Sequence, residues 1–273
     1  MSRLLAAASA EFRIALRNRW VAVAMAIMVL FAAVLSAAGS APMGELGADR
    51  LSVTVASLTS LGVYLVPLIA LLMSFDAIAG EVERGTLALV LAYPVKRWQL
   101  VAGKFAAHLV ILALAVVAGY GIAAAMAFSG GADAVRGLPA LWRLTWTSLL
   151  LGAVFLGAGY TVSALARRPG TAASLVVALW LVMIVLYDLA LLAGVAADGG
   201  GYFTTRIFPL ALLANPADAF RLFNLAASEA TAAASGISGA ADAIPPAQPL
   251  LSLVLWALAA FAAAIAAFRR ITP

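Results

Sequence analysis

The chain has 273 residues, of which 65% are hydrophobic and 11% are charged, and its formal net charge is +5 at pH 7. A soluble globular domain has about a quarter of its residues charged, so this composition excludes that class and indicates an integral membrane protein. The sequence contains no cysteine and one histidine, His108. It therefore excludes disulfide frameworks, thiolate metal sites and cysteine nucleophiles, and we expect no metal site within this chain.

The first twenty residues form a basic leader in which apolar residues recur at helical spacing. Its charged residues are Arg3, Glu11, Arg13, Arg17 and Arg19. This pattern predicts an interfacial amphipathic helix over residues 1–20 that leads into the first membrane span. A cleavable signal peptide is the alternative, because the basic leader is followed by an apolar run that ends near small residues.

Six apolar runs are long enough to cross a bilayer, which requires about 20 residues. They are Val21 to Ala38, Val53 to Ser74, Phe105 to Phe128, Leu144 to Leu165, Thr171 to Val195 and Leu250 to Phe268. We therefore expect an all-α, polytopic membrane protein with six transmembrane helices in a single domain over residues 1–273. Pro67 and nearby hydroxyls predict that the second span is kinked and buried against other helices. Close packing of the fourth span is predicted by Gly152, Gly157 and Gly159.

Basic residues are distributed unequally between the two sides of the predicted bundle. The side that holds both termini has 12 of the 17 lysines and arginines, and the other side has five. Because cytoplasmic loops of membrane proteins are enriched in basic residues, we expect both termini to be cytoplasmic in a multi-pass membrane protein. The basic residues lie at membrane edges rather than along one stripe, which favours contact with membrane lipid and argues against a nucleic-acid partner.

The longest loop on the opposite, outer side covers residues 196–249. It contains a helix start, with Asn215 as N-cap and Pro216 in the first turn. Polar residues then recur at helical spacing on one face, which is compatible with a docking surface for an outer partner or with the wet side of an interfacial helix. Residues 231–249 are expected to be irregular. The predicted docking residues are Asn215, Pro216, Asp218, Arg221 and Asn224.

A charged segment, residues 76–104, interrupts the apolar sequence on the cytoplasmic side. Charges are costly in hydrocarbon, about 2.5–3.5 kcal/mol each at the bilayer centre, so this segment must face water. The pattern from Glu81 to Leu91 predicts one short amphipathic helix, which Tyr93-Pro94 ends. We expect this helix to lie on the membrane surface and to offer Glu81 and Glu83 to a cytoplasmic partner, the alternative being a solvated charged loop.

Two single residues stand out from their apolar surroundings. Asp188 lies inside the fifth run, and an ionisable residue within a span is a functional candidate by default. It is a candidate gating residue, with structural hydrogen bonding as the alternative. His108, near the cytoplasmic end of the third run, is predicted to be a packing or interfacial residue rather than a metal ligand.

The sequence lacks the motifs of an enzyme. Gly103-Lys104 is followed by Phe105 and has no glycine at the position that a nucleotide-binding P-loop requires. The sequence shows no nucleophile elbow, paired-carboxylate site or metal-ligand spacing. We therefore expect no catalytic residue and no cofactor in this chain, which cannot hydrolyse ATP alone.

The charged segment resembles that of the ABC-2 type permeases. The shared motifs are Glu81-Val82-Glu83-Arg84-Gly85-Thr86-Leu87 and Pro94-Val95-Lys96-Arg97, followed by Gly103-Lys104. This resemblance implies a coupling helix that lies in a groove of a partner ATPase, and the partner holds ATP and Mg. The residues implied in ATPase coupling are Glu81, Glu83, Arg84, Gly85, Thr86 and Leu87.

A further set of segments resembles the ABC-2 permeases of nitrous oxide reductase maturation transporters. They are Arg17-Asn18-Arg19-Trp20, Ala56-Ser57-Leu58, Leu65-Val66-Pro67-Leu68-Ile69-Ala70-Leu71-Leu72, Tyr187-Asp188-Leu189-Ala190-Leu191-Leu192, Asn215-Pro216 with Asp218, and Arg221-Leu222-Phe223-Asn224-Leu225. The resemblance implies a homodimer of permeases, an ATPase dimer and one periplasmic protein, serving copper-site assembly in the reductase. Copper would be handled by the periplasmic partners, and this chain would transmit movement to them.

Two other functions fit the same topology. An ABC-2 exporter of a hydrophobic drug, lipid or glycan would open laterally between two chains, and its substrate would stimulate the ATPase. A structural or assembly protein of the membrane would have no partner ATPase. A neighbouring reading frame with nucleotide-binding motifs would argue against the second of these.

Overall fold

The computed structural model describes residue 12 and residues 19–38, 50–92, 96–129, 132–166, 168–225 and 244–271. Every regular element in these ranges is helical, which confirms the predicted all-α class. The elements are α2 (Arg19–Ala38), α3 (Arg50–Ser74), α4 (Asp76–Glu83), α5 (Thr86–Leu91), α6 (Arg97–Phe128), the 3-10 helix η1 (Ala132–Gly137), α7 (Leu138–Ala166), α8 (Pro169–Trp180), the π-helix η2 (Leu181–Leu186), α9 (Tyr187–Asp198), the π-helix η3 (Phe203–Ile207), α10 (Phe208–Ala214), α11 (Pro216–Leu225) and α14 (Ala247–Arg269).

The predicted spans correspond to long apolar helices. Within the described ranges, five helices are long and apolar enough to cross a membrane, and they coincide with the second to sixth predicted runs: Leu51–Glu83, Arg97–Phe128, Val135–Ala166, Pro169–Asp198 and Ala247–Arg269. The first predicted run forms α2, whose 20 residues make a helix about 30 Å long. The chain is therefore a multi-pass membrane protein.

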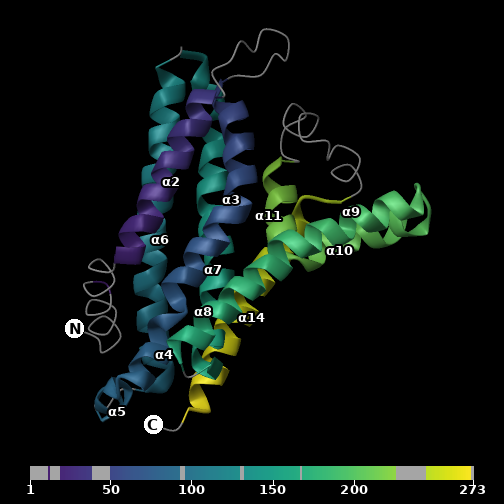
Figure 1. Ribbon diagram of the computed structural model, residues 1–273. Helices are drawn as coiled ribbons and strands as arrows, with labels where there is room; N and C mark the ends of the chain where they lie inside the picture. The colour runs from purple at the N-terminus through teal and green to yellow at the C-terminus, as the bar shows by residue number, and fades with distance from the viewer. Residues whose placement is uncertain are drawn as a thin grey trace.

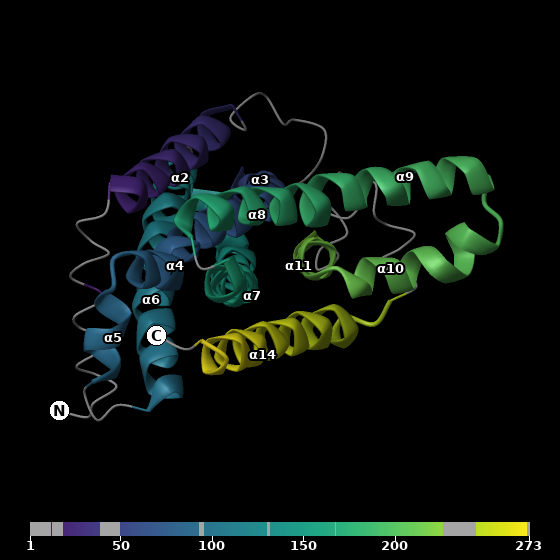
Figure 2. The same cartoon turned by 60° about the horizontal axis from the view of Figure 1, so that its bottom comes forward.

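The helices form a bundle from which a second group runs obliquely. In Figure 1, α2, α3, α6 and α7 stand side by side, whereas α8, α9 and α14 cross them at an angle. Figure 2 shows α9 projecting beyond the bundle, with α10 returning beside it. The two groups meet along α7, against which α3, α6, α8 and α14 all pack.

Small residues on α7 allow this packing, as the sequence predicts. A Cβ atom on Gly157 would lie 2.7 Å from the backbone carbonyl carbon of Ala260 in α14. On Gly159 it would strike the hydroxyl of Ser74, and on Gly152 the side chain of Leu112. The backbone of α7 is thus in contact with three neighbouring helices.

The second span is buried, again as predicted. Thr54 and Thr59 of α3 are buried, and the Thr59 hydroxyl donates a 2.8 Å hydrogen bond to the carbonyl of Val55. Such bonds satisfy hydroxyls inside an apolar helix. The helix contains Pro67 and continues beyond it to Ser74.

The expected outer loop is largely helical in its first half. The fifth span continues to Asp198, where Gly199 ends it in the left-handed conformation at φ 54°. The chain then returns through η3, α10 and α11, and the helix predicted after Asn215 is confirmed as α11. The sequence interpretation missed the apolar helix Phe203–Ala214, because a run of this length is too short for a span. The interfacial helix predicted over residues 1–20 lies almost entirely outside the described ranges, and so do residues 231–243 of the segment expected to be irregular. The end of that segment is helical, because α14 starts at Ala247.

Candidate functional site

The charged segment, residues 76–104, contains two short helices before α6 rather than the single helix predicted from Glu81 to Leu91. The first helix, α4, ends at Glu83, and α5 starts at Thr86. Between them, Gly85 has a φ of 68°, a left-handed conformation that glycine adopts without a steric penalty. The prediction was wrong because amphipathic spacing is the same on both sides of a two-residue break.

These two short helices are packed against three membrane spans. Ile78 of α4 and Leu87 of α5 are buried in a cluster with Val101 of α6, Tyr160 of α7 and Phe268 of α14. Figure 1 shows α4 and α5 at one end of the molecule, close to the end of α14. The two short helices therefore share one packed cluster with α6, α7 and α14.

Hydrogen bonds strengthen these attachments. The Ser163 hydroxyl of α7 accepts bonds from the amides of Ile78 and Ala79, at 3.1 and 2.9 Å. At the start of α6, the Arg97 guanidinium donates to the carbonyls of Arg269 and Ile271, at 3.0 and 2.7 Å. A cation at this position also interacts favourably with the C-terminal dipole of α14.

Glu81 forms an ion pair within the chain in this conformation, and its predicted contact with a partner stays a prediction. Its Oε1 lies 2.8 Å from Nζ of Lys104, and the two side chains are 17% and 5% exposed. One turn further along α6, the Nδ1 atom of buried His108 lies 2.7 Å from the Tyr160 hydroxyl. In this conformation, Glu81 therefore ties α4 to α6, and His108 is a packing residue, as the sequence predicts.

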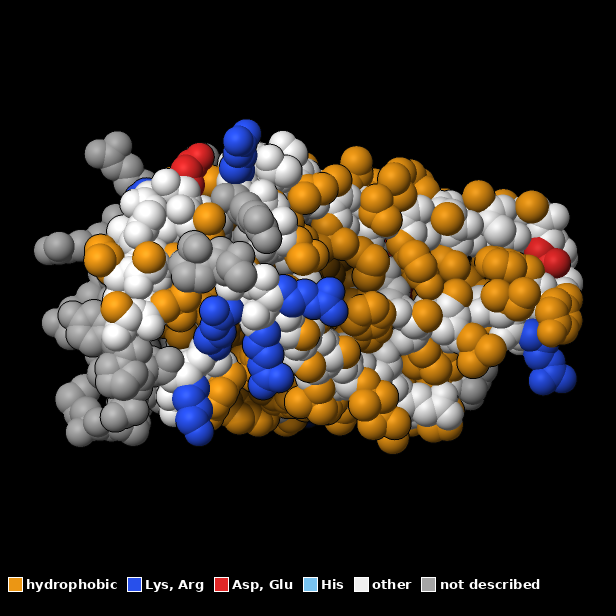
Figure 3. Space-filling model, turned by 90° about the horizontal axis from the view of Figure 1, so that it is seen from below, with side chains coloured by type: hydrophobic (Ala, Val, Ile, Leu, Met, Phe, Trp, Pro, Cys, Tyr) orange, Lys and Arg blue, Asp and Glu red, His pale blue; other side chains and the backbone are white. Residues whose placement is uncertain are grey.

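The turn between the two helices of the charged segment is exposed. Glu83, Arg84 and Gly85 are exposed, whereas Leu87 is buried and the Thr86 hydroxyl donates to the carbonyl of Glu81 at 3.3 Å. Figure 3 views the molecule from this end and shows several Lys and Arg side chains gathered on it. Exposed basic residues at this end include Lys96, Arg168, Arg269 and Arg270.

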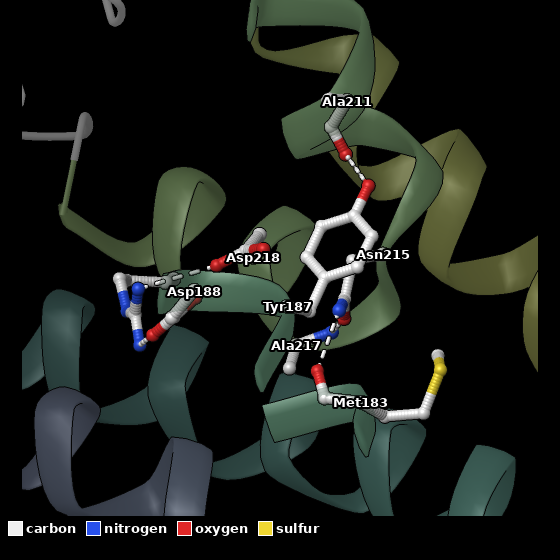
Figure 4. Close-up of polar contacts among 8 residues, drawn as sticks. Met183, Tyr187, Asp188, Ala211, Asn215, Ala217 and Asp218 are labelled. Atoms are coloured by element: carbon white, nitrogen blue, oxygen red, sulfur yellow. Dashed lines mark hydrogen bonds and ion pairs between the residues drawn. The ribbon is translucent and has the colours of Figure 1, made fainter. Parts of the chain in front are cut away.

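A second polar site joins the fifth span to α11. The Oδ1 atom of Asn215 accepts a 2.8 Å bond from the amide of Ala217, which is the predicted N-cap, and its Nδ2 donates a 2.7 Å bond to the carbonyl of Met183. Met183 lies in η2, where a π-helical turn changes the hydrogen-bonding pattern of the backbone. Figure 4 shows Asn215 bridging the two elements.

The next residues of the fifth span extend this contact. The Tyr187 hydroxyl donates to the carbonyl of Ala211 in α10, at 2.8 Å. Beside it, Oδ2 of Asp188 lies 2.9 Å from Nη2 of Arg221, whose Nη1 lies 3.2 Å from Oδ1 of Asp218. Burial raises the pKa of Asp218 to about 7, and the charge of Asp188 acts in the same direction against the opposing effect of Arg221.

The other side of α11 is attached to α7 and α14. Asn224 Nδ2 donates to the Thr147 hydroxyl at 3.0 Å, and a nitrogen of Arg143 lies 3.5 Å from the Asn224 carbonyl. Just before α11, the Trp256 indole of α14 donates to the carbonyl of Ala214 at 3.1 Å. α11 therefore connects the fifth span to the bundle and to the sixth span.

The predicted docking residues are mostly inaccessible in this conformation. Asn215, Pro216, Asp218 and Asn224 are buried, and only Arg221 is partly exposed. Their side chains bond within the chain, so a role in docking a partner stays a prediction. Asp188 is hydrogen-bonded within the chain, which agrees with the structural role considered as the alternative to gating. Its gating role stays a prediction.

Sequence reasoning missed three participants in these contacts. Lys104 enters the sequence analysis only through the Gly103-Lys104 motif, and its local pattern does not predict the buried ion pair with Glu81. Tyr187 enters only through a segment of the family resemblance, which does not predict its bond to Ala211. Nothing in the sequence predicts that the Met183 carbonyl accepts a hydrogen bond, because hydrophobic spacing does not reveal a π-helical turn inside an apolar run.

Comparison with known proteins identifies the family. A family model described as "ABC-2 family transporter protein" matches residues 5–271. The chain belongs to this family. It is 43% identical over 217 residues to the "Probable ABC transporter permease protein NosY" of Pseudomonas aeruginosa, covering 79% of this chain and 78% of the relative. A protein of the same description from Stutzerimonas stutzeri is 41% identical over 222 residues, covering 79% of each. The chain is thus an ABC transporter permease subunit, a type of subunit that works with a partner ATPase.

Proposed function

We propose that this permease couples ATP hydrolysis by a NosF-like ATPase dimer to periplasmic copper-site assembly of nitrous oxide reductase. The observation that carries the proposal is the 41–43% identity to two permeases named NosY over 79% of the chain. In the proposed assembly, two copies of this chain lie in the bacterial inner membrane with cytoplasmic termini. A NosD-like protein binds on the periplasmic side.

The attachments of α4 and α5 support mechanical transmission. The exposed turn at Glu83, Arg84 and Gly85 is the surface we assign to ATPase contact. Closure of the ATPase dimer would move α4 and α5, and these helices are attached to α6 through Lys104 and to α7 through Ser163. Such coupling requires contacts that differ in free energy between the two states of the transporter.

At the other end, α11 is the element we expect to receive this movement. It is bonded to η2 through Asn215 and to α7 through Asn224. The chain has no cysteine, and its one histidine is hydrogen-bonded to Tyr160. We therefore assign copper to the periplasmic partners and mechanical work to this chain.

We expect the exposed apolar faces of α8, α9 and α14 to contact lipid and the second copy of the permease. The second, third and fourth spans are 44–61% buried over their most apolar stretch, whereas the fifth and sixth spans are only 17% buried. Without a water-filled pore, such apolar surface must contact hydrocarbon or another apolar surface. Exposed leucines on these helices include Leu175, Leu189, Leu192, Leu251, Leu255 and Leu258.

ATPase binding tests the assigned coupling surface. The Arg84→Glu variant reverses the charge of an exposed residue whose only ion pair among the described residues is a 3.7 Å contact to Asp76, and such pairs contribute little to stability. We expect the variant to insert normally but to lose co-purification of the ATPase subunit. Arg136→Glu is the matched control, because Arg136 is exposed beyond the far end of α6. Full ATPase binding by Arg84→Glu would remove this turn from the interface.

A further inference from the structure

Two carboxylates share one guanidinium where α11 meets the fifth span. Asp188 belongs to α9, and Asp218 and Arg221 belong to α11. Arg221 contacts both acids, at 2.9 and 3.2 Å. If both carboxylates were ionised, the three groups would carry a net charge of −1 in a largely buried place.

The buried position of Asp218 makes ionisation of both carboxylates costly in free energy. Its side chain is 1% exposed, and its Oδ2 is buried without a hydrogen-bond partner. An ionised carboxylate can only accept hydrogen bonds, and a buried charged oxygen without a donor costs free energy. A proton on the carboxyl group removes the charge and supplies an O–H donor.

The groups around Asp218 offer no second compensating cation among the described residues. Asp188 and Tyr187 face it from α9, and Tyr64 of α3 acts on Arg221. On the opposite side of α11, the guanidinium of Arg143 in α7 lies near the Asn224 carbonyl. The sequence of α10 has no ionisable side chain. The only ionisable side chain in α14 is Arg269, at the far end of that helix.

We propose that Asp188, Asp218 and Arg221 form a proton-binding site in which the two carboxylates share one proton and Arg221 balances the remaining negative charge. The Asp218 hydroxyl donates to Asp188 in the protonated state. Loss of the proton to water leaves two carboxylates against one guanidinium, and their repulsion weakens the contact between α11 and α9. Proton binding thereby sets how firmly α11 holds the fifth span, independently of which partner the transporter serves.

The pKa of Asp218 fits this site. Burial and the nearby charge of Asp188 both raise the pKa of Asp218, which favours a proton on this carboxyl group. Because the folded-state pKa of Asp218, about 7, exceeds its ordinary value of 3.8, the folded protein binds the proton more tightly than the unfolded chain. The resulting stabilisation is complete below the ordinary value and is lost as pH rises through about 7.

The test measures thermal unfolding of the full-length protein in lipid nanodiscs as a function of pH. The wild type should lose stability as pH rises through about 7, whereas Asp218→Asn should lack this loss. Asp188→Asn should move the loss to lower pH by about one unit or more, because it removes the like charge that disfavours ionisation of Asp218. Glu83→Gln, which removes an exposed carboxylate, is the control and should keep the wild-type profile.

Infrared difference spectroscopy of the same samples provides a readout that does not depend on the stability of the variants. A protonated-carboxyl band that titrates near neutral pH in the wild type and shifts in Asp188→Asn would support the site. The absence of such a band in the wild type would overturn the proposal. So would an unchanged pH profile of stability in both Asp218→Asn and Asp188→Asn.

Discussion

At the scale of single residues, backbone contact between helices depends on glycines of α7. The approach is closest at Gly157, where an added Cβ would lie within 2.7–2.9 Å of Ala260 atoms in α14. Two of those atoms belong to the α14 backbone, which cannot move aside as a flexible side chain can. The contact between the fourth and sixth spans therefore has no space for a methyl group.

Gly157→Ala should destabilise the protein by about 1–3 kcal/mol through overpacking. The measurement is equilibrium unfolding of the purified protein in mixed detergent micelles. Gly121→Ala is the control, since nothing lies within 4 Å of a Cβ at that position of α6. Equal stability of the two variants would show that α14 can move away from α7 at little cost.

The buried pair between Glu81 and Lys104 also acts at this scale. Removing one member leaves the other charge buried without its partner, which typically costs about 3–5 kcal/mol. Lys104→Met should therefore destabilise the protein strongly. The double variant Lys104→Met with Glu81→Leu should recover much of the loss, because apolar replacement of a buried pair is often tolerated. If the double variant is as unstable as the sum of the two single variants, the 2.8 Å contact does not couple these residues.

At the scale of elements, α11 depends on one amide side chain for two different contacts. Asn215 caps the helix through its oxygen and binds the Met183 carbonyl through its nitrogen. A serine retains the cap, because its hydroxyl can accept from the same backbone amide. The serine side chain is too short to replace the bond from the Asn215 amide nitrogen to the Met183 carbonyl of η2.

Comparing Asn215→Ser with Asn215→Ala separates these two contacts. Loss of an N-cap costs about 0.5–2 kcal/mol, so Asn215→Ala should be the less stable variant by about that amount. Asn215→Ser should still lose stability relative to wild type, because the Met183 carbonyl loses a donor. Hydrogen exchange of the fifth span should increase in both variants. Wild-type exchange in Asn215→Ser would mean that the bond to η2 does not hold the span.

Elements that follow from hydrophobic run length were predictable, and those that depend on local backbone breaks were not. All six apolar runs correspond to helices, and Asn215-Pro216 marked the start of α11. The turn at Gly85 and the π-helix before Tyr187 leave the hydrophobic spacing unchanged. The burial of Asp218 and Asn224 results from the return of α11 into the bundle, which no local pattern in the outer segment indicates.

At the scale of the whole molecule, two polar attachments lie at opposite ends of an apolar bundle. One attaches α4 to α6 through Lys104 and to α7 through Ser163, and the other attaches α11 to α7 through Asn224 and to the fifth span through Asn215. α7 takes part in both, and α14 packs against α7 and α11. Movement that starts at the coupling turn therefore has a continuous packed route to α11, which is the structural basis of the proposed transmission.

The most direct test of this account is the copper content and activity of periplasmic nitrous oxide reductase in a strain that lacks this chain. We predict a copper-deficient, inactive reductase that is rescued by wild type and by Arg136→Glu but not by Arg84→Glu. A fully metallated, active reductase in the deletion strain would contradict the proposed function and leave export of another substrate as the role of this permease.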